Sequence, residues 1–362
     1  MSATKVGILT ERMIMGYGVD LVVHKTAEGL TRRGFDVKVY CNMFDGTYSD
    51  ETYEIVRLDA RADSRQEYEE AVLSVAGPAV ADRDILIAES FPYFRVAYES
   101  GKPWVAVDHG VVPSWGVPRT KRGEFEYIRS MQYGVYYRGA TRIVCVSNFL
   151  RHQLSRELQE KAVVIHPGID HYPRLFLTNL RDLYGIEEPI LLYLGRSTDT
   201  SPYKNTDDLL NCYCHLKERA QDLKLVIATA CSPKEQARLE KGGALVLTNV
   251  QPEFIPSLYA SCDVFVTATK WEGFDLPALE ASYFGRPVVA YRVGGHLEII
   301  RHEETGFLAD TFQQFESFLG RLIADADLRE RMGASGEKFA SGSFRWSESI
   351  SKYTSLILGM KV

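Results

Sequence analysis

The residues best suited to chemistry lie in the stretch 271–282, which reads WEGFDLPALEAS and directly follows the apolar run DVFVTAT. An acid, a glycine turn and a proline in the first helical turn would present backbone N–H groups and the positive end of a helix, which favour an anion. Glu272 precedes the turn and Glu280 lies within the helix, so one carboxylate could contact sugar hydroxyls while the other accepts two hydrogen bonds from a ribose. The alternative interpretation is a capped helix with Asp275 as its N-cap and two surface glutamates.

Two cations precede this stretch. In the string LYLGRSTDTSPYKN, Arg196 follows the end of an apolar run and Lys204 comes eight residues later. Two cations at the carboxyl edge of the first strand of a domain are well placed to hold a diphosphate. Alone, they would be interpreted as solvated surface charge. Their occurrence together with the two glutamates favours an anion site.

The elements that must position these residues follow from short apolar runs between amphipathic stretches. The first half of the chain contains KVGILT, DVKVY, DILIAES, PWVAVD, TRIVCVS and AVVIHPG. Continuous apolar character is typical of strands that are covered on both faces, so these runs predict a parallel sheet between layers of helices. We expect helices at 19–33, ended by Gly34, and at 148–158, opened by Ser147 or Asn148. The first half is therefore predicted to be a doubly wound α/β domain.

A second series of apolar runs follows the polar, aromatic segment GIDHYPRLFLTNLRDLYGIEEP. It consists of ILLYLG, LKLVIAT, GALVLT, DVFVTAT and RPVVAYR, each followed by a helical pattern. This series predicts a domain boundary near residues 170–188 and two similar α/β domains in tandem. The last segment, FRWSESISKYTSLILG, has one helical stripe that must be buried, made of Trp346, Ile350, Tyr353 and Leu356.

Composition limits the classes of function. The chain has 362 residues, of which 45% are hydrophobic and 25% are charged, enough for two domains with proper cores. Its formal net charge of -6 disfavours nucleic acid as a partner, although the basic loop 119–122 could act locally. The six cysteines form no Cys-x-x-Cys pair and are typical of a reducing compartment, and we find neither a signal peptide nor an apolar run of about 18 residues. We expect a cytoplasmic protein without a transmembrane segment, with peripheral membrane contact left open.

In their order and spacing, the strings GR...K, EGFDLPALEAS and VGGHLEII resemble the donor-binding half of the GT-B-fold glycosyltransferases of family 4. The resemblance covers nearly the whole chain and includes a glycine loop after the first strand, Asp108-His109-Gly110, IVCVSNF, VVIHPGID and a final helix with a tryptophan. It is strong in residues 190–310 and thin in residues 42–135. It implies two Rossmann-like, doubly wound parallel-sheet domains that face a cleft. These would be an acceptor-binding domain, 1–175, completed by a C-terminal helix, 345–362, that crosses back to it, and a donor-binding domain, 176–344.

The resemblance also implies catalytic roles for residues at matching positions. Glu272 would contact the transferred sugar, and Glu280 would hold the nucleotide ribose. Arg196 and Lys204 would bind the diphosphate. His109, at a strand end in the first half, would lie close to the reacting carbon.

Other matching positions would bind the donor through the backbone. Gly16 and Gly18 would let the first loop approach the donor phosphate, because glycine has no side chain. The second loop would support sugar and phosphate through four consecutive residues, Gly273, Phe274, Asp275 and Leu276. Three residues depart from the commonest pattern, because Asp275, Asn205 and Asn249 stand where glycine is frequent. Asparagine tolerates a left-handed backbone, whereas an aspartate directed at phosphates would repel them, so we expect Asp275 to cap the helix instead.

The implied activity is that of a retaining, metal-independent hexosyltransferase. Its donor would be a nucleotide-diphosphate sugar, with UDP and GDP sugars as candidates, and its acceptor would be a hydroxyl group of a glycan, a lipid-linked molecule or a small molecule. A nucleoside diphosphate is a good leaving group, so the main task of the protein would be to neutralise the charge that grows on it, and no cofactor or metal is expected.

Several alternatives stay open at this point. Asp325-Ala326-Asp327 matches the Asp-x-Asp pattern with which a different transferase fold holds a metal, but it ends a helical pattern and is expected to cap the next helix. The stretch 16–21 lacks the third glycine of the dinucleotide fingerprint, which disfavours a nicotinamide enzyme. The remaining alternatives are a sugar-nucleotide epimerase, which also uses two facing Rossmann-like domains, and a non-catalytic partner protein with the same fold.

Overall fold

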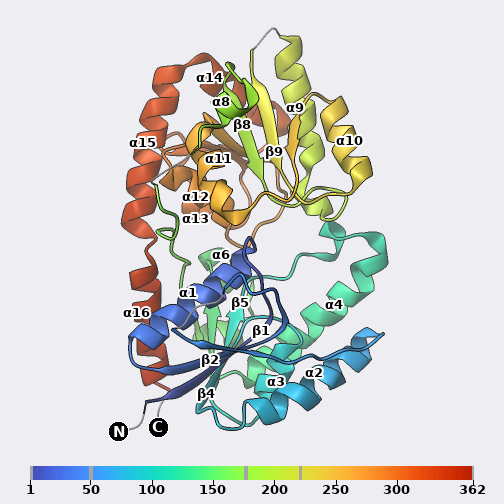
Figure 1. Ribbon diagram of the computed structural model, residues 1–362, viewed down its shortest axis with the longest axis vertical. Coiled ribbons are helices and arrows are strands. Elements are labelled where there is room, and N and C mark those ends of the chain that lie inside the picture. Colours follow the sequence, from blue (N-terminus) through green and yellow to red (C-terminus); the bar gives the residue numbers. More distant parts are fainter. Residues whose placement is uncertain (1–2, 49–51, 175–177, 220–221, 361–362) are drawn as a thin grey trace. The chain divides into compact units, whose positions relative to one another are not determined.

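The computed structural model describes residues 3–48, 52–174, 178–219 and 222–360 (Figure 1). The chain divides into two compact units. Unit 1 comprises Met1–Val111, Glu126–Gly168 and Arg345–Val362, and unit 2 comprises Val112–Phe125 and Ile169–Phe344.

Unit 1 contains a parallel sheet that has seven strands within the described residues, in the order β3-β2-β1-β4-β5-β6-β7. The strands are β1 (Lys5–Met13), β2 (Asp36–Phe44), β3 (Glu54–Arg57), β4 (Ile85–Ala88), β5 (Trp104–Asp108), β6 (Arg142–Cys145) and β7 (Ala162–Val164). Every residue of β4 and β5 is buried, as expected of strands covered on both faces. All six predicted runs of this half form strands. The edge strand β3 was not predicted, because its sequence, EIVR, is short and has charged ends.

Helices and turns connect the strands of unit 1. They are α1 (Gly18–Arg32), α2 (Arg65–Ala79), α3 (Tyr93–Glu99), α4 (Arg122–Met131), a π-helical turn (Gln132–Tyr136), α5 (Tyr137–Gly139), α6 (Asn148–Gln153) and α7 (Arg156–Glu160). The helix expected at 19–33 corresponds to α1, and Gly34 follows it with a φ of 87°. The helix predicted at 148–158 is wrong in extent, because Leu154 has an extended backbone that separates α6 from α7. Ser147 caps α6 as predicted, by accepting a hydrogen bond from the backbone N–H of Leu150 (3.2 Å).

The C-terminal helix α16 (Trp346–Leu358) packs against α1 in unit 1 (Figure 1). The two helices touch closely, since a Cβ added to Gly29 of α1 would lie only 2.4 Å from Cγ1 of Ile350. The predicted return of this helix to the first half of the chain is confirmed. The predicted apolar stripe is correct except at its last residue, because Ile357 is fully buried whereas Leu356 is half-buried. Helical spacing from Tyr353 allows either residue, and the packing selects Ile357.

Unit 2 contains a second parallel sheet, with six strands among the residues described, in the order β10-β9-β8-β11-β12-β13. The strands are β8 (Ile190–Leu194), β9 (Lys224–Ala228), β10 (Leu245–Leu247), β11 (Val264–Thr267), β12 (Val288–Tyr291) and β13 (Gly306–Ala309). The five predicted runs form β8 to β12. The edge strand β13 was not predicted, because GFLA directly follows the polar stretch RHEET.

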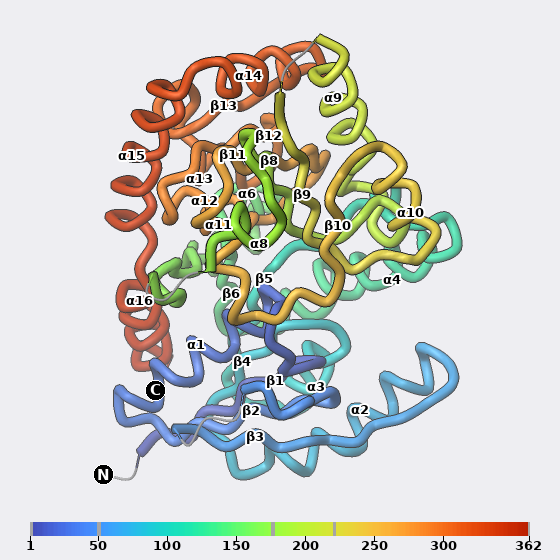
Figure 2. The backbone as a smooth tube through the Cα atoms, turned by 45° about the horizontal axis from the view of Figure 1, so that its top comes forward, coloured from blue at the N-terminus to red at the C-terminus, as the bar shows by residue number. Residues whose placement is uncertain are grey.

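The helices of unit 2 cover this sheet. They are α8 (Leu180–Tyr184), α9 (Thr206–Glu218), α10 (Pro233–Lys241), α11 (Ile255–Ser261), α12 (Leu276–Tyr283), α13 (His296–Ile299), α14 (Phe312–Ala324) and α15 (Ala326–Ser343), with 3₁₀ turns at Ser114–Gly116, Arg119–Lys121, Pro202–Lys204 and Pro252–Phe254. The long helix α15 runs beside α12 (Figure 2). Asp325 caps α15 as predicted, by accepting a hydrogen bond from the backbone N–H of Leu328 (2.8 Å). The predicted fold class, two doubly wound parallel sheets with a returning C-terminal helix, is confirmed.

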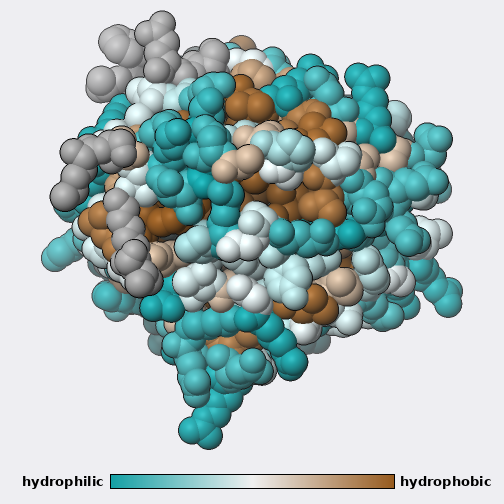
Figure 3. All heavy atoms as spheres, turned by 90° about the horizontal axis from the view of Figure 1, so that it is seen from below, coloured by the Kyte–Doolittle hydropathy of each residue, from teal (hydrophilic) through white to brown (hydrophobic). Residues whose placement is uncertain are grey.

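The helices and the surface were compared with what a membrane-spanning segment requires. Among the residues that the structure describes, no helix combines the length and the apolar character needed to cross a bilayer. The face shown in Figure 3 is mainly hydrophilic, with hydrophobic side chains gathered in separate patches.

Candidate functional site

The turn between β11 and α12 has the structure that its sequence predicts. Asp275 adopts a left-handed backbone, with a φ of 75°, and its Oδ1 accepts a hydrogen bond from the N–H of Ala278 (3.4 Å). It is therefore the N-cap of α12, as expected, and Pro277 occupies the first turn. The positive end of α12 thus lies at the carboxyl edge of the sheet, where backbone dipoles favour an anion.

A buried ion pair joins this turn to the 3₁₀ turn Pro202–Lys204, which lies between β8 and α9. Nζ of Lys204 lies 2.7 Å from Oε2 of Glu272, and the two side chains are only 14% and 15% exposed. Burial disfavours the charged ammonium, but Glu272 together with Tyr203, Tyr193 and Asp275 outweighs burial and raises the pKa of Lys204. Burial also raises the pKa of Glu272, and Lys204 opposes this shift. The structure thus brings together the lysine and the first glutamate that the sequence singled out, and the raised pKa keeps the ammonium of Lys204 charged at neutral pH.

Tyr203 contacts both Arg196, the other predicted cation, and Lys204 of this ion pair. Arg196 is exposed two residues beyond β8, and its Nη2 donates to the hydroxyl of Tyr203 at 2.9 Å. Lys204 lies 5.3 Å from the centre of the Tyr203 ring, and Trp271 packs edge-on against the same ring. Sequence reasoning missed Tyr203, although its position directly before Lys204 was a signal.

The second glutamate, Glu280, lies almost fully buried within α12. Its Oε2 accepts a hydrogen bond from the hydroxyl of Tyr259 in α11 (2.6 Å), and its Oε1 lies 3.2 Å from Nε2 of His171. These two contacts fix the orientation of the carboxylate, which has further lone pairs for a ligand. Neither partner was predicted. His171 follows the string VVIHPGID directly, whereas no sequence signal marked Tyr259.

A second buried ion pair holds Asp275. Nε2 of His296 lies 2.8 Å from Oδ2 of Asp275, and Nδ1 of His296 lies 2.8 Å from the carbonyl oxygen of Tyr291. Burial alone would raise the pKa of Asp275, but the hydrogen bond and charge of His296, together with the charge of Lys204, outweigh burial, so this pKa is lowered. Burial alone would lower the pKa of His296, but Asp275 outweighs it, so this pKa is raised. Sequence reasoning noted the string VGGHLEII but did not single out His296.

Three predicted residues, Gly16, Gly18 and His109, belong to unit 1. Gly16 lies in the turn after β1 with a φ of 95°, a backbone that favours glycine, and Gly18 is the first residue of α1. Asp20 holds this loop, because its Oδ2 accepts hydrogen bonds from Nε of Arg12 (3.0 Å) and the backbone N–H of Ile14 (3.1 Å). Burial raises the pKa of Asp20 to about 6.

His109 follows β5 and pairs with a buried acid. Its Nε2 lies 2.7 Å from Oε2 of Glu89, which comes directly after the neighbouring strand β4. Glu89 is 3% exposed. Glu89 was not predicted as the partner of His109, although it lies in the run DILIAES and its position at a strand end was a signal.

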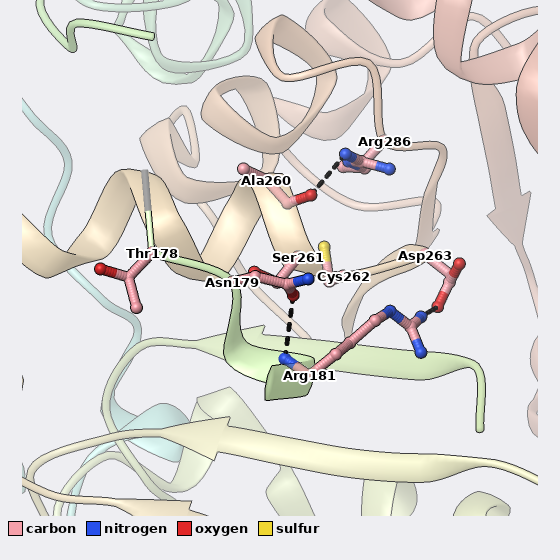
Figure 4. Close-up of a pocket in the computed structure, with 8 residues that line it drawn as sticks. All are labelled: Thr178, Asn179, Arg181, Ala260, Ser261, Cys262, Asp263 and Arg286. Carbon is pink, nitrogen blue, oxygen red and sulfur yellow. Dashed lines mark hydrogen bonds and ion pairs between the residues drawn. The ribbon is translucent and has the colours of Figure 1, made fainter. Parts of the chain in front are cut away.

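A pocket of about 240 Å³ lies at the other edge of the unit 2 sheet (Figure 4). Its lining includes Asp263 and Arg286, which precede β11 and β12, whereas the predicted residues follow the strands. Asp263 is paired with Arg181, and Arg286 donates to the carbonyl oxygen of Ala260 at 2.5 Å. This pocket contains none of the predicted site residues.

The chemistry that unit 2 supports is anion binding. Its candidate site combines the start of a helix with two cations, Arg196 and Lys204, and a carboxylate, Glu272, whose Oε1 receives no hydrogen bond from the described residues. The described residues contain no group of three or more His, Cys, Asp or Glu side chains placed to hold a metal ion.

Two family models match the chain. Residues 17–172 match the model of Glycosyltransferase Family 4, and residues 181–339 match that of Glycosyl transferases group 1. Among curated proteins, an uncharacterized glycosyltransferase of Methanocaldococcus jannaschii is 26% identical over 58% of this chain and 57% of its own length. A D-inositol 3-phosphate glycosyltransferase of Xylanimonas cellulosilytica is 30% identical over 47% of this chain and 43% of its own length. The chain spans about half the length of the curated relatives that it matches.

Solved structures resemble the fold over nearly its full length. Sucrose-phosphate synthase from Thermosynechococcus elongatus has a TM-score of 0.81 at 16% identity, with 99% of both chains covered. HepE from Anabaena, in complex with UDP and glucose, has a TM-score of 0.80 at 17% identity, with 98% of this chain and 100% of that chain covered.

Proposed function

Because the chain belongs to glycosyltransferase family 4 and has the GT-B fold, we propose that it transfers a sugar from a nucleotide-diphosphate sugar to a hydroxyl group of an acceptor. The observation that carries the proposal is the buried pair of Lys204 and Glu272 (2.7 Å) at the start of α12. A charged ammonium at the positive end of a helix suits a diphosphate. The UDP and glucose in the HepE complex make UDP-glucose the first donor to test.

Each part of the donor has a candidate partner in unit 2. Arg196, Lys204 and the backbone of residues 273–276 bind the diphosphate. Glu272 uses one carboxylate oxygen for Lys204 and the other for hydroxyls of the transferred sugar. Glu280, which Tyr259 and His171 hold in place, accepts hydrogen bonds from the ribose.

The proposed reaction needs no protein acid. The bond between the anomeric carbon and the diphosphate oxygen breaks, and the acceptor oxygen forms a new bond to that carbon from the same face. The proton of the acceptor hydroxyl passes to an oxygen of the departing diphosphate, so the products are a nucleoside diphosphate and a glycoside of retained configuration. Lys204 and Arg196 stabilise the charge that grows on the leaving group. Such electrostatic stabilisation by fixed donors is usually the largest single contribution to catalysis.

Unit 1 supplies the remaining residues of the proposal. Gly16, in the turn before α1, and Gly18, the first residue of α1, have no side chains, which suits an approach to phosphate. His109, oriented by Glu89, acts at the reacting carbon. The acceptor-binding role of residues 1–175 with 345–362, the donor-binding role of 176–344 and a cytoplasmic location with peripheral membrane contact stay predictions.

The function is tested with purified protein and a panel of UDP, GDP, ADP and dTDP sugars. A donor that binds is expected to raise the melting temperature, because binding to the folded state alone stabilises it. That donor is then incubated with glycan, lipid-linked and small-molecule acceptors, and the product is identified by mass spectrometry and the anomeric configuration by NMR. Stabilisation by none of the donors would contradict the proposal.

Incubation of the donor alone separates the alternatives. Conversion of the sugar nucleotide into an epimer without any acceptor would identify a sugar-nucleotide epimerase. Binding without hydrolysis, epimerisation or transfer to any acceptor would favour a non-catalytic protein. The presence of Arg196, Lys204, Glu272 and Glu280 together argues for a transferase.

Glu280→Gln is expected to weaken nucleoside diphosphate binding by about tenfold to a hundredfold, because charge-assisted hydrogen bonds to the ribose are lost. Isothermal titration calorimetry measures this change. The control is Glu304→Gln, which neutralises an exposed glutamate paired with Arg301 and should leave the affinity unchanged. A 2′,3′-dideoxynucleoside diphosphate should bind the native protein and the Glu280 variant equally. Equal binding of the complete nucleotide to both would remove Glu280 from the ribose site.

A further inference from the structure

The charges at the start of α12 depend on one proton. The site holds two cations, Arg196 and Lys204, and two carboxylates, Glu272 and Asp275, so these four side chains together have no net charge. Four side chains without net charge provide no net electrostatic attraction for a diphosphate. The site becomes positive when His296 carries an additional proton.

The contacts of His296 require that proton. Its Nδ1 lies 2.8 Å from the carbonyl oxygen of Tyr291, which can only accept, and its Nε2 lies 2.8 Å from the Asp275 carboxylate. A neutral imidazole has one N–H, so two acceptors need a second proton, on the ring or shared with the carboxylate. His296 is fully buried and Asp275 nearly so, and a buried carboxylate without a partner would be costly. The raised pKa of His296 and the lowered pKa of Asp275 agree with an imidazolium–carboxylate pair.

The other titratable groups beside this pair are the ion-paired Lys204 and Glu272 and two buried tyrosines. Glu272 and Lys204 are the charged groups beside Asp275 and His296, and Glu272 raises the pKa of Lys204 further above neutrality. Tyr193 and Tyr203 lie beside Lys204, and burial raises their pKa values, so they stay neutral. His296 is therefore the group whose charge changes as the pH rises.

We propose that His296 is a positioning residue of the donor site, whose imidazolium cancels the charge of Asp275 and so lets a diphosphate bind at the start of α12. This inference rests on the proposed function. It explains how a carboxylate can occupy position 275, where it caps α12 within the proposed phosphate site. Loss of the proton restores the negative charge of Asp275, so the affinity for a diphosphate falls as the pH rises through the raised pKa of His296.

The test compares the native chain with three variants, His296→Gln, Asp275→Asn and the double variant. Isothermal titration calorimetry measures the dissociation constants of UDP or GDP and of the matching nucleoside from about pH 7 to about pH 10, a range in which an ordinary carboxylate stays ionised. His296→Gln leaves the charge of Asp275 uncompensated. It should weaken diphosphate binding by about tenfold to a hundredfold, which corresponds to the Coulomb energy of one charge at the site. The nucleoside, which has no phosphate, should bind as before.

Asp275→Asn keeps the helix cap and removes the charge, so its affinity for the diphosphate should not depend on pH in this range. The double variant should recover the affinity that His296→Gln loses. A purely structural role of His296 predicts the opposite, since the double variant would bind as poorly as the single one and the nucleoside would weaken as well. If His296→Gln does not fold, the proposal is tested by comparing how the diphosphate affinities of the native protein and of Asp275→Asn depend on pH.

Two results would overturn this inference, and they differ from one another. Native protein that binds no nucleoside diphosphate overturns the proposed function, and this inference with it. Native protein that binds a diphosphate with the same pH dependence as Asp275→Asn overturns only the role of His296.

Discussion

Lys204→Ala is expected to lower the turnover number by about 100- to 1,000-fold, the usual effect of removing one fixed electrostatic donor from a reaction. In the native protein the ammonium is buried beside Glu272 and stays charged, so it can stabilise a departing diphosphate without rearrangement. Alanine leaves no cation at that position. Steady-state kinetics of sugar transfer, or of donor hydrolysis, measures the change.

The matched control for this lysine is Lys217→Ala. Lys217 is exposed in α9 of the same unit and lies 3.9 Å from Asp222, so the same substitution there should leave the turnover number unaltered. Circular dichroism establishes that both variants fold. A folded Lys204→Ala variant with native turnover would exclude this side chain from the mechanism, and a parallel loss in Lys217→Ala would show that the effect is not specific to the site.

Gly294→Ala is expected to destabilise unit 2 by about 2–5 kcal/mol, the sum of a left-handed backbone for alanine and of overpacking. Gly294 has a φ of 53°, and a Cβ there would lie 2.0 Å from the carbonyl oxygen of Glu272. The loop that leads to His296 therefore lies directly against the turn that carries Glu272. A side chain at this position must displace one of the two, and both belong to the candidate site.

The control for this glycine is Gly342→Ala, near the end of α15. Gly342 has no heavy atom within 4 Å of an added Cβ, so alanine there should be neutral or stabilise the protein by about 0.5–1 kcal/mol. Urea unfolding of both variants gives the free energies. Native stability of Gly294→Ala would show that the contact with Glu272 is looser than its geometry indicates.

Strands and caps could be predicted because their causes are local. The apolar runs of β4, β5, β8 and β11 are buried on both faces, and their residues have no polar alternation that would indicate an exposed face. The cap formed by Asp275 followed from the repulsion between a carboxylate and phosphates. Two of the four edge strands, β3 and β13, were missed, because EIVR has charged ends and GFLA follows the polar stretch RHEET.

The partners of the site residues could not be predicted, because tertiary contacts decide them. His296 reaches Asp275 across 21 residues of sequence, and Tyr259 reaches Glu280 across the same separation. Histidine and tyrosine at such positions are usually ordinary core residues, so their types alone carried no signal. The resemblance to family 4 indicated which residues would meet the ligand, but not which would hold them in place.

The packing of α16 against α1 affects the order in which the two units can fold during translation. Unit 2 is complete once the ribosome has made residue 344, but unit 1 still lacks residues 345–362. Until α16 emerges, the surface of α1 at Gly29 that Ile350 covers is exposed to water. The half of the protein that is synthesised first is therefore finished last, and its incomplete form presents an apolar surface that chaperones can bind.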